Sequence, residues 1–515
     1  MPSCAEAIAR SLAARGVELL FGLPGGEIVA FLDACRRAGI RFILTGHESS
    51  AAWMAQVTGQ ITGIPGVCAS TLGPGATNLV TGVANAFLDR APLLAFTAQI
   101  PDSSLATMTH QRLALDTLFA PVTKASLKVD ESFSTDGALD LALEPRPGPV
   151  HVSLASDLAT KECFFHEKPR SARAIRPVSA EPVAARIAES RRPIVLIGLG
   201  ATPAIAAAAG ALIDGLQCPF LVTPKAKGIL SEDHPLFLGV ASGMALDREI
   251  LETIRAADLV IAVGFDPVEC DKTWFANTEI VSIDSVSMAE GEYRPLEAIG
   301  DIAALLGQIE PALKPWPREL IEQRRAAIAR APGDGLSPLR VIEELRAVCP
   351  RDGIATCDVG SHKLAMGQFW RSYQPGTFFM SNGLSGMGFG LPAAIAAQLA
   401  YPERGVVAVV GDGGMLMMLH DMTLIRELNL PILIVVFTDR SLSLIRVSEH
   451  RRGIAPYGVD FTPPDFAAIA EAFGICSARV TSIAEFRAAA DRALAARTAC
   501  LLDVAIDFRE YYEIV

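Results

Sequence analysis

Two aspartates stand where two buried strands are expected to end. The runs Gly405–Val410 and Ile432–Thr438 are apolar at nearly every position, which is typical of parallel strands covered on both faces. Asp412 follows the first run, and Asp439 follows the second, 27 residues further on (412 to 439). Ligands of such sheets bind beyond the carboxyl ends of the strands. The two carboxylates, with the backbone carbonyl of Ser441, could therefore supply oxygens to an octahedral Mg²⁺.

Three glycines surround the first of these aspartates: Gly411, Gly413 and Gly414. A glycine carries no Cβ, so its backbone amide can approach a phosphate closely. The same four letters, GDGG, also form ordinary turns. A helix-like stretch at Leu419–Leu428 lies between the two apolar runs.

The first third of the chain holds a second group of polar candidates. Glu48 stands at the start of a helical pattern, where an acid is also favoured simply by the helix dipole. The loop GPGATN, from Gly73 to Asn78, lies between an apolar run and another helical pattern, and by itself it is only a Gly-rich turn. His110 and Gln111 could equally be an ordinary polar surface pair.

Short apolar runs alternate with helical patterns along almost the whole chain, which predicts an α/β fold with parallel sheets. A chain of 515 residues exceeds one hydrophobic core, so we expect several domains. A polar, proline-bearing stretch at Lys161–Pro182 reads as a linker. We predict three doubly wound domains, at 1–165, 180–317 and 335–515.

Bulk composition excludes several classes of function. Half the residues are hydrophobic, the formal charge is −12 and no Lys/Arg-rich run occurs, so neither nucleic acid nor a membrane is expected as a partner. No stretch has the roughly 20 apolar residues that span a bilayer, and the first residues read as a helix. The ten cysteines include no CxxC pair, which favours free thiols and a cytoplasmic location.

Together these motifs resemble those of the thiamine-diphosphate-dependent enzymes, whose signature is GDG followed some 27 residues later by Asn or Asp. The resemblance extends over nearly the whole chain. It implies a pyrimidine-binding domain, a middle Rossmann-like domain and a diphosphate-binding domain, with thiamine diphosphate and Mg²⁺ as cofactors. The implied metal ligands are Asp412, Asp439 and the carbonyl of Ser441.

The resemblance also implies roles for individual residues. Glu48 would hydrogen-bond N1′ of the aminopyrimidine, Gln111 would reach the reacting centre beside His110, and Met387 would wedge between the rings of the cofactor. The residues implied to contact the cofactor are Pro24, Gly73, Asn78, Gly360, Ser361, His362, Ser385, Gly386, Met387, Gly411, Gly413 and Gly414.

Within this family, the chain is similar to the catabolic, flavin-independent acetolactate synthases, for example at Gly264–Glu269. The resemblance to this subgroup implies that the middle domain holds no functional FAD. The turn Gly198–Pro203 lacks the third glycine of a dinucleotide fingerprint and is interpreted as structural. The resemblance implies decarboxylation of a 2-oxo acid with carboligation. The alternatives are a decarboxylase that releases an aldehyde, or another lyase or acyltransferase of the family. A homodimer or homotetramer with active sites at the subunit interface is expected.

Two positions depart from those synthases near the expected substrate. Glu27 stands where they have a lysine, and Arg446 replaces an apolar residue. Arginine offers a planar, charged fork suited to a carboxylate. We expect Arg446 either to anchor the substrate carboxylate or to pair with an acid such as Glu27 or Glu449; a solvated side chain is the simpler alternative.

Overall fold

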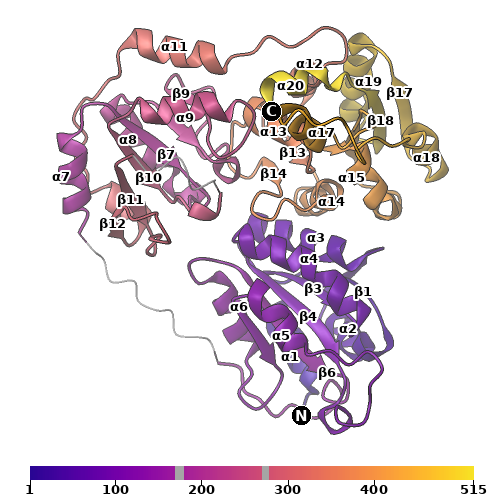
Figure 1. The fold of residues 1–515 in the computed structure, drawn as a ribbon. Coiled ribbons are helices and arrows are strands. Elements are labelled where there is room, and N and C mark those ends of the chain that lie inside the picture. The colour runs from indigo at the N-terminus through magenta and orange to yellow at the C-terminus, as the bar shows by residue number, and fades with distance from the viewer. Residues whose placement is uncertain (169–178, 270–277) are drawn as a thin grey trace. The chain divides into compact units, whose positions relative to one another are not determined.

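The structure is a computed structural model and describes residues 1–168, 179–269 and 278–515. In these residues the strands form three six-stranded sheets, and all pairings between the named strands are parallel (Figure 1). The predicted α/β class with three parallel sheets is confirmed. The domain boundaries 1–165, 180–317 and 335–515 stay predictions. Of the expected linker Lys161–Pro182, residues 169–178 lie outside the described residues.

The first sheet has the strand order β2-β1-β3-β4-β6-β5. Its strands are β1 (Leu19–Leu23), β2 (Arg41–Leu44), β3 (Gly66–Ser70), β4 (Leu93–Gln99), β5 (Ala125–Lys128) and β6 (Pro149–Ala155). The helices of this part of the chain are α1 (Cys4–Ala14), α2 (Val29–Arg37), α3 (Glu48–Thr62), α4 (Pro74–Leu88), α5 (Leu115–Phe119) and α6 (Thr135–Leu143).

The second sheet has the order β12-β11-β10-β7-β8-β9, which is the 3-2-1-4-5-6 order of a Rossmann fold read from the other edge. Its strands are β7 (Pro193–Ile197), β8 (Phe220–Val222), β9 (Phe237–Val240), β10 (Leu259–Val263), β11 (Ile280–Asp284) and β12 (Leu296–Ile299). The helices are α7 (Glu181–Glu189), α8 (Ala206–Leu216), α9 (Asp247–Arg255), α10 (Ile302–Leu306) and α11 (Arg318–Ile328).

The third sheet has the order β14-β13-β15-β16-β18-β17, so it repeats the strand order of the first sheet. Its strands are β13 (Ile354–Cys357), β14 (Phe378–Met380), β15 (Val406–Gly411), β16 (Ile432–Thr438), β17 (Cys476–Val480) and β18 (Cys500–Ala505). The helices are α12 (Pro338–Val348), α13 (Ser361–Phe369), α14 (Gly390–Ala400), α15 (Asp412–Met417), α16 (Met422–Glu427), α17 (Ser443–Arg451), α18 (Phe466–Ala472), α19 (Ile483–Ala496) and α20 (Tyr511–Ile514).

By its internal contacts the chain divides into two compact units. The first unit contains the first sheet together with α14 and α16, although these two helices follow β14 and β15 in sequence. Helix α3 packs against both α4 and α14. The second unit contains the other two sheets, and one continuous hydrophobic cluster runs through both of them.

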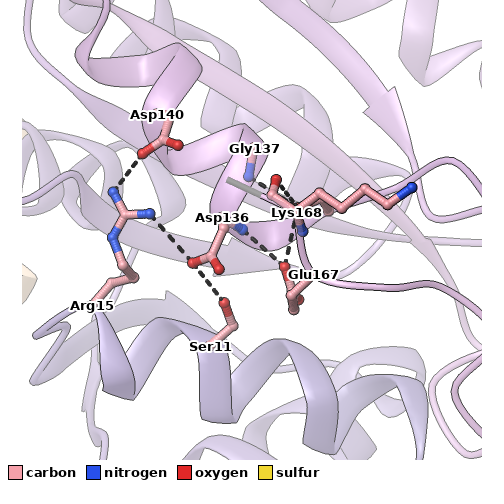
Figure 2. A network of polar contacts seen from close by, with 8 residues as sticks. Ser11, Arg15, Asp136, Gly137, Asp140, Glu167 and Lys168 are labelled. Carbon is pink, nitrogen blue, oxygen red and sulfur yellow. Dashed lines mark hydrogen bonds and ion pairs between the residues drawn. The ribbon is translucent and has the colours of Figure 1, made fainter. Parts of the chain in front are cut away.

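Local sequence explains how the first unit is fastened at its N-terminus. Ser3 caps α1: its Oγ accepts from the amide of Glu6 (3.2 Å), and a carboxylate oxygen of Glu6 accepts from the amide of Ser3 (2.9 Å). This reciprocal capping box satisfies two amides that the helix cannot. Figure 2 shows how α1 is then joined to α6: Arg15 reaches Asp136 (3.3 Å) and Asp140 (2.6 Å).

Most predicted elements match closely, with shifts at their ends. Strand β15 runs from Val406 to Gly411, where the apolar run Gly405–Val410 was expected, and α16 covers Met422–Glu427 of the helix-like stretch Leu419–Leu428. Helix α4 already begins at Pro74, so most of the GPGATN motif forms its first turn. Proline is favoured there because the first helical amide has no partner to lose. In the described residues, no helix is long and apolar enough to cross a membrane.

Candidate functional site

The candidate residues gather in two places, one in each unit. In the first unit, Glu48 is the first residue of α3, and it is buried, with 4% of its surface exposed. Asn78, in the first turns of α4, donates its side-chain Nδ2–H to Oε2 of Glu48 (3.0 Å). His47 caps α3, its Nδ1 accepting from the amide of Ser49 (3.1 Å). Asn78 therefore orients a buried carboxylate at the start of a helix.

Two glycines let the loop before α4 approach this carboxylate. A Cβ on Gly75 would lie 2.8 Å from Cγ2 of Thr71 and 3.3 Å from Oε1 of Glu48. A Cβ on Gly73 would lie 2.9 Å from Cβ of Gln111, and Gly73 has a positive φ of 59°. Real Cβ atoms do not approach neighbours at 2.8 or 2.9 Å, so the packing of Gln111 and Thr71 against this loop requires glycine.

Glu27 joins the same group through Thr71. The hydroxyl of Thr71 donates to Oε2 of Glu27 (2.7 Å). Thr71 and Glu48 both pack against Gly75. Of the other predicted residues in this unit, Pro24, His110 and Ser385 are exposed. Gly386 packs against Trp53 of α3: a Cβ on Gly386 would lie 3.6 Å from Cζ2 of Trp53. Met387 is half-buried.

The second unit holds the two aspartates at the carboxyl ends of neighbouring strands β15 and β16. Oδ1 of Asp412 accepts from the amide of Gly413 (2.8 Å), and Oδ1 of Asp439 accepts from the amide of Ser441 (3.1 Å). Burial raises the pKa of Asp412 to about 6. Burial, and then the charge of Asp412, raise the pKa of Asp439 to about 7. Two carboxylates that disfavour each other's charge are suited to a shared cation.

The segment 360–362, which the resemblance implied to contact the cofactor, lies beside these aspartates. His362, in the first turn of α13, is buried, and no protein group bonds its Nε2 in the described residues. Burial lowers the pKa of His362 to about 4. A Cβ on Gly411 would lie 2.9 Å from Cε1 of His362, and one on Gly414 would lie 1.9 Å from Oδ2 of Asp358. The hydroxyl of Ser443 donates to that of Ser361 (3.1 Å), which ties the loop to α17.

Arg446 projects from α17 next to the aspartates. It forms an ion pair with Asp460, and its guanidinium carbon lies 5.1 Å from the ring centroid of Phe508. Its acidic neighbour is therefore Asp460, which the sequence pattern did not indicate. One open pocket of about 390 Å³ is lined by Asp439, Arg440, Arg446, Asp460, Phe461 and Thr462. The predicted metal ligand Asp439 and the predicted substrate residue Arg446 share this pocket.

These residues fit the cofactors that the sequence implied. Among the described residues there is no cluster of three or more His, Cys, Asp or Glu side chains arranged for a metal. A Mg²⁺ with two carboxylates and a carbonyl needs no third side chain, because phosphate and water complete its octahedron. The buried Nε2 of His362 lacks a protein partner in the described residues. The glycines at 411 and 414 let the backbone of this loop pack closely against His362 and Asp358, since a Cβ there would collide with them. The unpartnered nitrogen suits an anionic group held beside a metal.

Comparison with protein families finds matches in three parts of the chain. Three family models match: Thiamine pyrophosphate enzyme, N-terminal TPP binding domain, over residues 2–118; the central domain over 180–309; and the C-terminal TPP binding domain over 358–504. The chain belongs to the thiamine pyrophosphate enzymes.

Similar proteins of this family extend along nearly the whole chain. A probable acetolactate synthase large subunit of Methanocaldococcus jannaschii is 32% identical, over 98% of this chain and 92% of that protein. An acetolactate synthase of Bacillus subtilis is 31% identical over 98% and 93%. A catabolic acetolactate synthase of Raoultella terrigena is 31% identical over 98% and 95%.

The match to thiamine pyrophosphate enzymes places the two residue groups in different domains of the family. Glu48, Asn78 and Gln111 lie within the N-terminal TPP binding domain, and both aspartates lie within the C-terminal one. Two neighbours of these groups were missed from the sequence. Thr71 precedes the glycine motif in a run of small residues, and Asp460 belongs to no recognised motif. The sequence pattern therefore provided no reason to select either residue.

Proposed function

We propose that this thiamine pyrophosphate enzyme decarboxylates a 2-oxo acid and joins the remaining acyl unit to a second carbonyl compound, as in an acetolactate synthase. The main support is the similarity over 98% of the chain to proteins named acetolactate synthase. The geometry that agrees best with it is the pair of aspartates that follow β15 and β16, of which Asp412 is buried and Asp439 is half-buried. The aldehyde-releasing decarboxylase is not favoured by these relatives.

Asp412, Asp439 and the carbonyl of Ser441 would hold Mg²⁺, which prefers such oxygen ligands. The backbone amides of Gly413 and Gly414 and the buried Nε2 of His362 would then donate to or face the diphosphate. When bound, thiamine diphosphate supplies an electron sink for the pair released as CO₂ leaves. The protein residues serve to place the metal and the diphosphate and to keep bulk water from the buried carboxylates.

Glu48 would share a proton with N1′ of the aminopyrimidine, and Asn78 would keep its carboxylate in the required orientation. Gln111 and His110 would approach the reacting centre from the loop that packs on Gly73. Glu27, held by Thr71, and Arg446, in the pocket of Asp439, would contact the substrate. Ser385, Gly386 and Met387, with Pro24, would contact the pyrimidine side of the cofactor.

The product distinguishes the carboligase from a simple decarboxylase. Purified enzyme with thiamine diphosphate and Mg²⁺ is supplied with a panel of 2-oxo acids, and the products are identified by mass spectrometry. A branched 2-hydroxy-3-oxo acid is the expected product. Release of a free aldehyde in stoichiometric yield with CO₂ would contradict ligation. Glu48→Gln is the matched inactive control, because it keeps the size of the side chain but removes the acid.

We propose that the middle domain carries no flavin. Buried Glu269 already accepts from the amide of Leu199 in the glycine turn (2.8 Å), where a dinucleotide would need a free amide. Two further acids, Asp266 and Asp284, belong to this domain; burial chiefly, with a smaller effect of the charge of Asp266, raises the pKa of Asp284 to about 7. FAD released on denaturation in stoichiometric amount would contradict this proposal.

We further propose that the enzyme is a homodimer or homotetramer with active sites shared between subunits, because the N-terminal and C-terminal TPP binding domains of the family each hold half of the implied site. Light scattering would measure the assembly, and an active monomer would contradict it. We place the enzyme in the cytoplasm, a reducing compartment, because the nine cysteines in the described ranges are free thiols.

A further inference from the structure

Two cysteines face each other across neighbouring strands in the third sheet. Cys476 begins β17, and Cys500 begins β18, and the two residues are direct partners in the parallel register. Their sulfur atoms lie 3.6 Å apart. Among the nine described cysteines, Cys476 alone is exposed, whereas Cys500 is buried, with 4% of its surface exposed. The pair therefore combines one accessible thiol with one protected thiol.

The backbone geometry allows a bond between them. Neighbouring strands lie about 4.7–4.9 Å apart, which falls inside the Cα separation of about 4.4–6.8 Å found for disulfides. The sulfur atoms must approach from 3.6 Å to a bonded distance of about 2.05 Å. Since β17 is the edge strand of its sheet, it has one neighbouring strand to resist this movement.

The surroundings decide which sulfur reacts first. The thiol of Cys500 donates to the sulfur of Cys476, and Cys476 is exposed whereas Cys500 is buried, so a reagent from solution reaches Cys476 first. Burial, and then the contact with Cys476, raise the pKa of the Cys500 thiol to about 12. Thiolates are the nucleophiles in disulfide exchange. Cys476 is therefore the attacking residue, and Cys500 acts second.

We propose that Cys476 and Cys500 form a reversible disulfide on exposure to a low-molecular-weight disulfide, R–S–S–R. The Cys476 thiolate attacks one sulfur, forming Cys476–S–S–R and releasing R–S⁻. The Cys500 sulfur then attacks the Cys476 sulfur, forming the protein disulfide and releasing a second R–S⁻. Two protein thiols are oxidised, one R–S–S–R is reduced to two thiols, and the two protein protons pass to the released thiolates.

The position of the pair defines what the disulfide does. Cys476 and Cys500 stand at the amino ends of their strands, whereas Asp412 and Asp439 stand at the carboxyl ends of β15 and β16. The disulfide would thus fasten the edge strand without reaching the metal loop. It would also remove the exposed thiol from further oxidation, because a sulfur in a disulfide is no longer a thiolate that can advance to sulfinic acid.

Peptide mapping of the full-length protein tests the proposal directly. Reduced protein is incubated with oxidised glutathione, free thiols are alkylated under denaturing conditions, and the protein is digested with trypsin. The sequence places Cys476 in the tryptic peptide 453–479 and Cys500 in 498–509, each with one cysteine. The expected result is a linked pair of these two peptides, which separates on adding dithiothreitol. The seven other described cysteines should remain alkylated.

Single serine variants identify the order of attack. Cys500→Ser should stop at the mixed disulfide, with glutathione retained on peptide 453–479. Cys476→Ser should leave Cys500 fully alkylated. If wild-type protein retains glutathione on Cys476 while Cys500 is alkylated, or if either residue pairs with a different cysteine, the proposal is wrong. The wild-type result alone decides this, even if a variant folds poorly.

Discussion

The backbone amide of Arg440 donates a hydrogen bond to Oδ2 of Asp412, with an N···O distance of 2.7 Å. This contact joins the loop after β16 to the loop after β15. Arg440 has a positive φ of 63° in this turn, a conformation that non-glycine residues adopt at a cost of about 1–3 kcal/mol. The strained residue follows Asp439 directly, and its amide binds Asp412. The turn at Arg440 therefore fixes the side chain of Asp412 relative to the loop that carries Asp439.

Asp412→Asn should abolish Mg²⁺-dependent binding of thiamine diphosphate while the fold is kept. The amide is similar in size, but it brings one oxygen and no charge to the metal. Asp503→Asn is the matched control, since Asp503 is also a buried acid of this sheet and bonds Thr438 (2.6 Å) instead of lining the pocket. Calorimetry measures both. Unchanged cofactor affinity in Asp412→Asn would refute the metal assignment.

Affinity for Mg²⁺ should rise with pH. The pKa of Asp412 is raised to about 6 and that of Asp439 to about 7, both first by burial, so each carboxyl is protonated below these values and cannot bind the metal. Calorimetry with Mg²⁺ and thiamine diphosphate between about pH 5.5 and 8 should show affinity increasing and then levelling, with protons released on binding. An affinity that is flat over this range would contradict the assignment.

The same shifts predict how the metal-free protein responds to pH. A carboxyl with a raised pKa binds its proton more tightly in the folded than in the unfolded state. Folding is therefore weakened by these two groups as pH rises from their ordinary value of 3.8 to about 7. Chemical denaturation with and without Mg²⁺ should give a difference in unfolding free energy that grows with pH across this window. Asp439→Asn should reduce that growth.

Arg446→Leu should raise KM for the best 2-oxo acid by an amount equivalent to about 1.5–3 kcal/mol, the size of a charge-assisted hydrogen bond. Arg446 lines the pocket that also contains Asp439. Its guanidinium is paired with Asp460, and it could bind the carboxylate of a substrate while it keeps this ion pair. Asp460→Asn separates the two roles of Arg446. If Arg446 binds substrate, this variant should keep or lower KM. If KM and kcat stay the same in Arg446→Leu, the arginine serves only the ion pair.

Gly414→Ala should destabilise the protein by about 1–3 kcal/mol, as overpacking does. Its Cβ would lie 1.9 Å from Oδ2 of Asp358, so the loop must move. Gly210→Ala is the control: this glycine is also helical, but its Cβ would lie 3.5 Å from Leu230, and alanine should stabilise by about 0.5–1 kcal/mol. Thermal or chemical unfolding compares the two. Equal effects would show that the contact at Asp358 does not matter.

The sequence pattern predicted the fold class because uniformly apolar runs such as Ile432–Thr438 form buried parallel strands whatever surrounds them. It did not reveal that the first and third sheets have the same strand order, because strand order depends on long-range pairing that leaves no local repeat. The less apolar strands β5 and β17 were also not recognised. Nearly all their residues are half-buried or exposed, as is common in edge strands.

The sequence motifs indicated close backbone packing at glycines, and the structure has such packing at Gly73, Gly75 and Gly414, where a Cβ would collide with a neighbour. The roles of the site residues stay predictions. Contacts between side chains distant in sequence were not predictable. Arg446 was expected to meet a substrate, Glu27 or Glu449, whereas Asp460 lies beside it. The pairing of Cys476 with Cys500 likewise depends on the register of two strands that are joined through a helix.

Helix α14 belongs by its contacts to the unit built on the first sheet, although it lies between β14 and β15 in sequence. Within that unit, the amide of Gly383 donates to Oδ1 of Asp89 (2.8 Å), and the hydroxyl of Ser50 donates to Asp421 (2.8 Å). The C-terminal third therefore cannot be exchanged as an independent module. A chimaera that takes this third from a relative would also need the matching α3 and α4 from that relative. Recombination among such enzymes is thus constrained by two helices that lie in the N-terminal part of the chain.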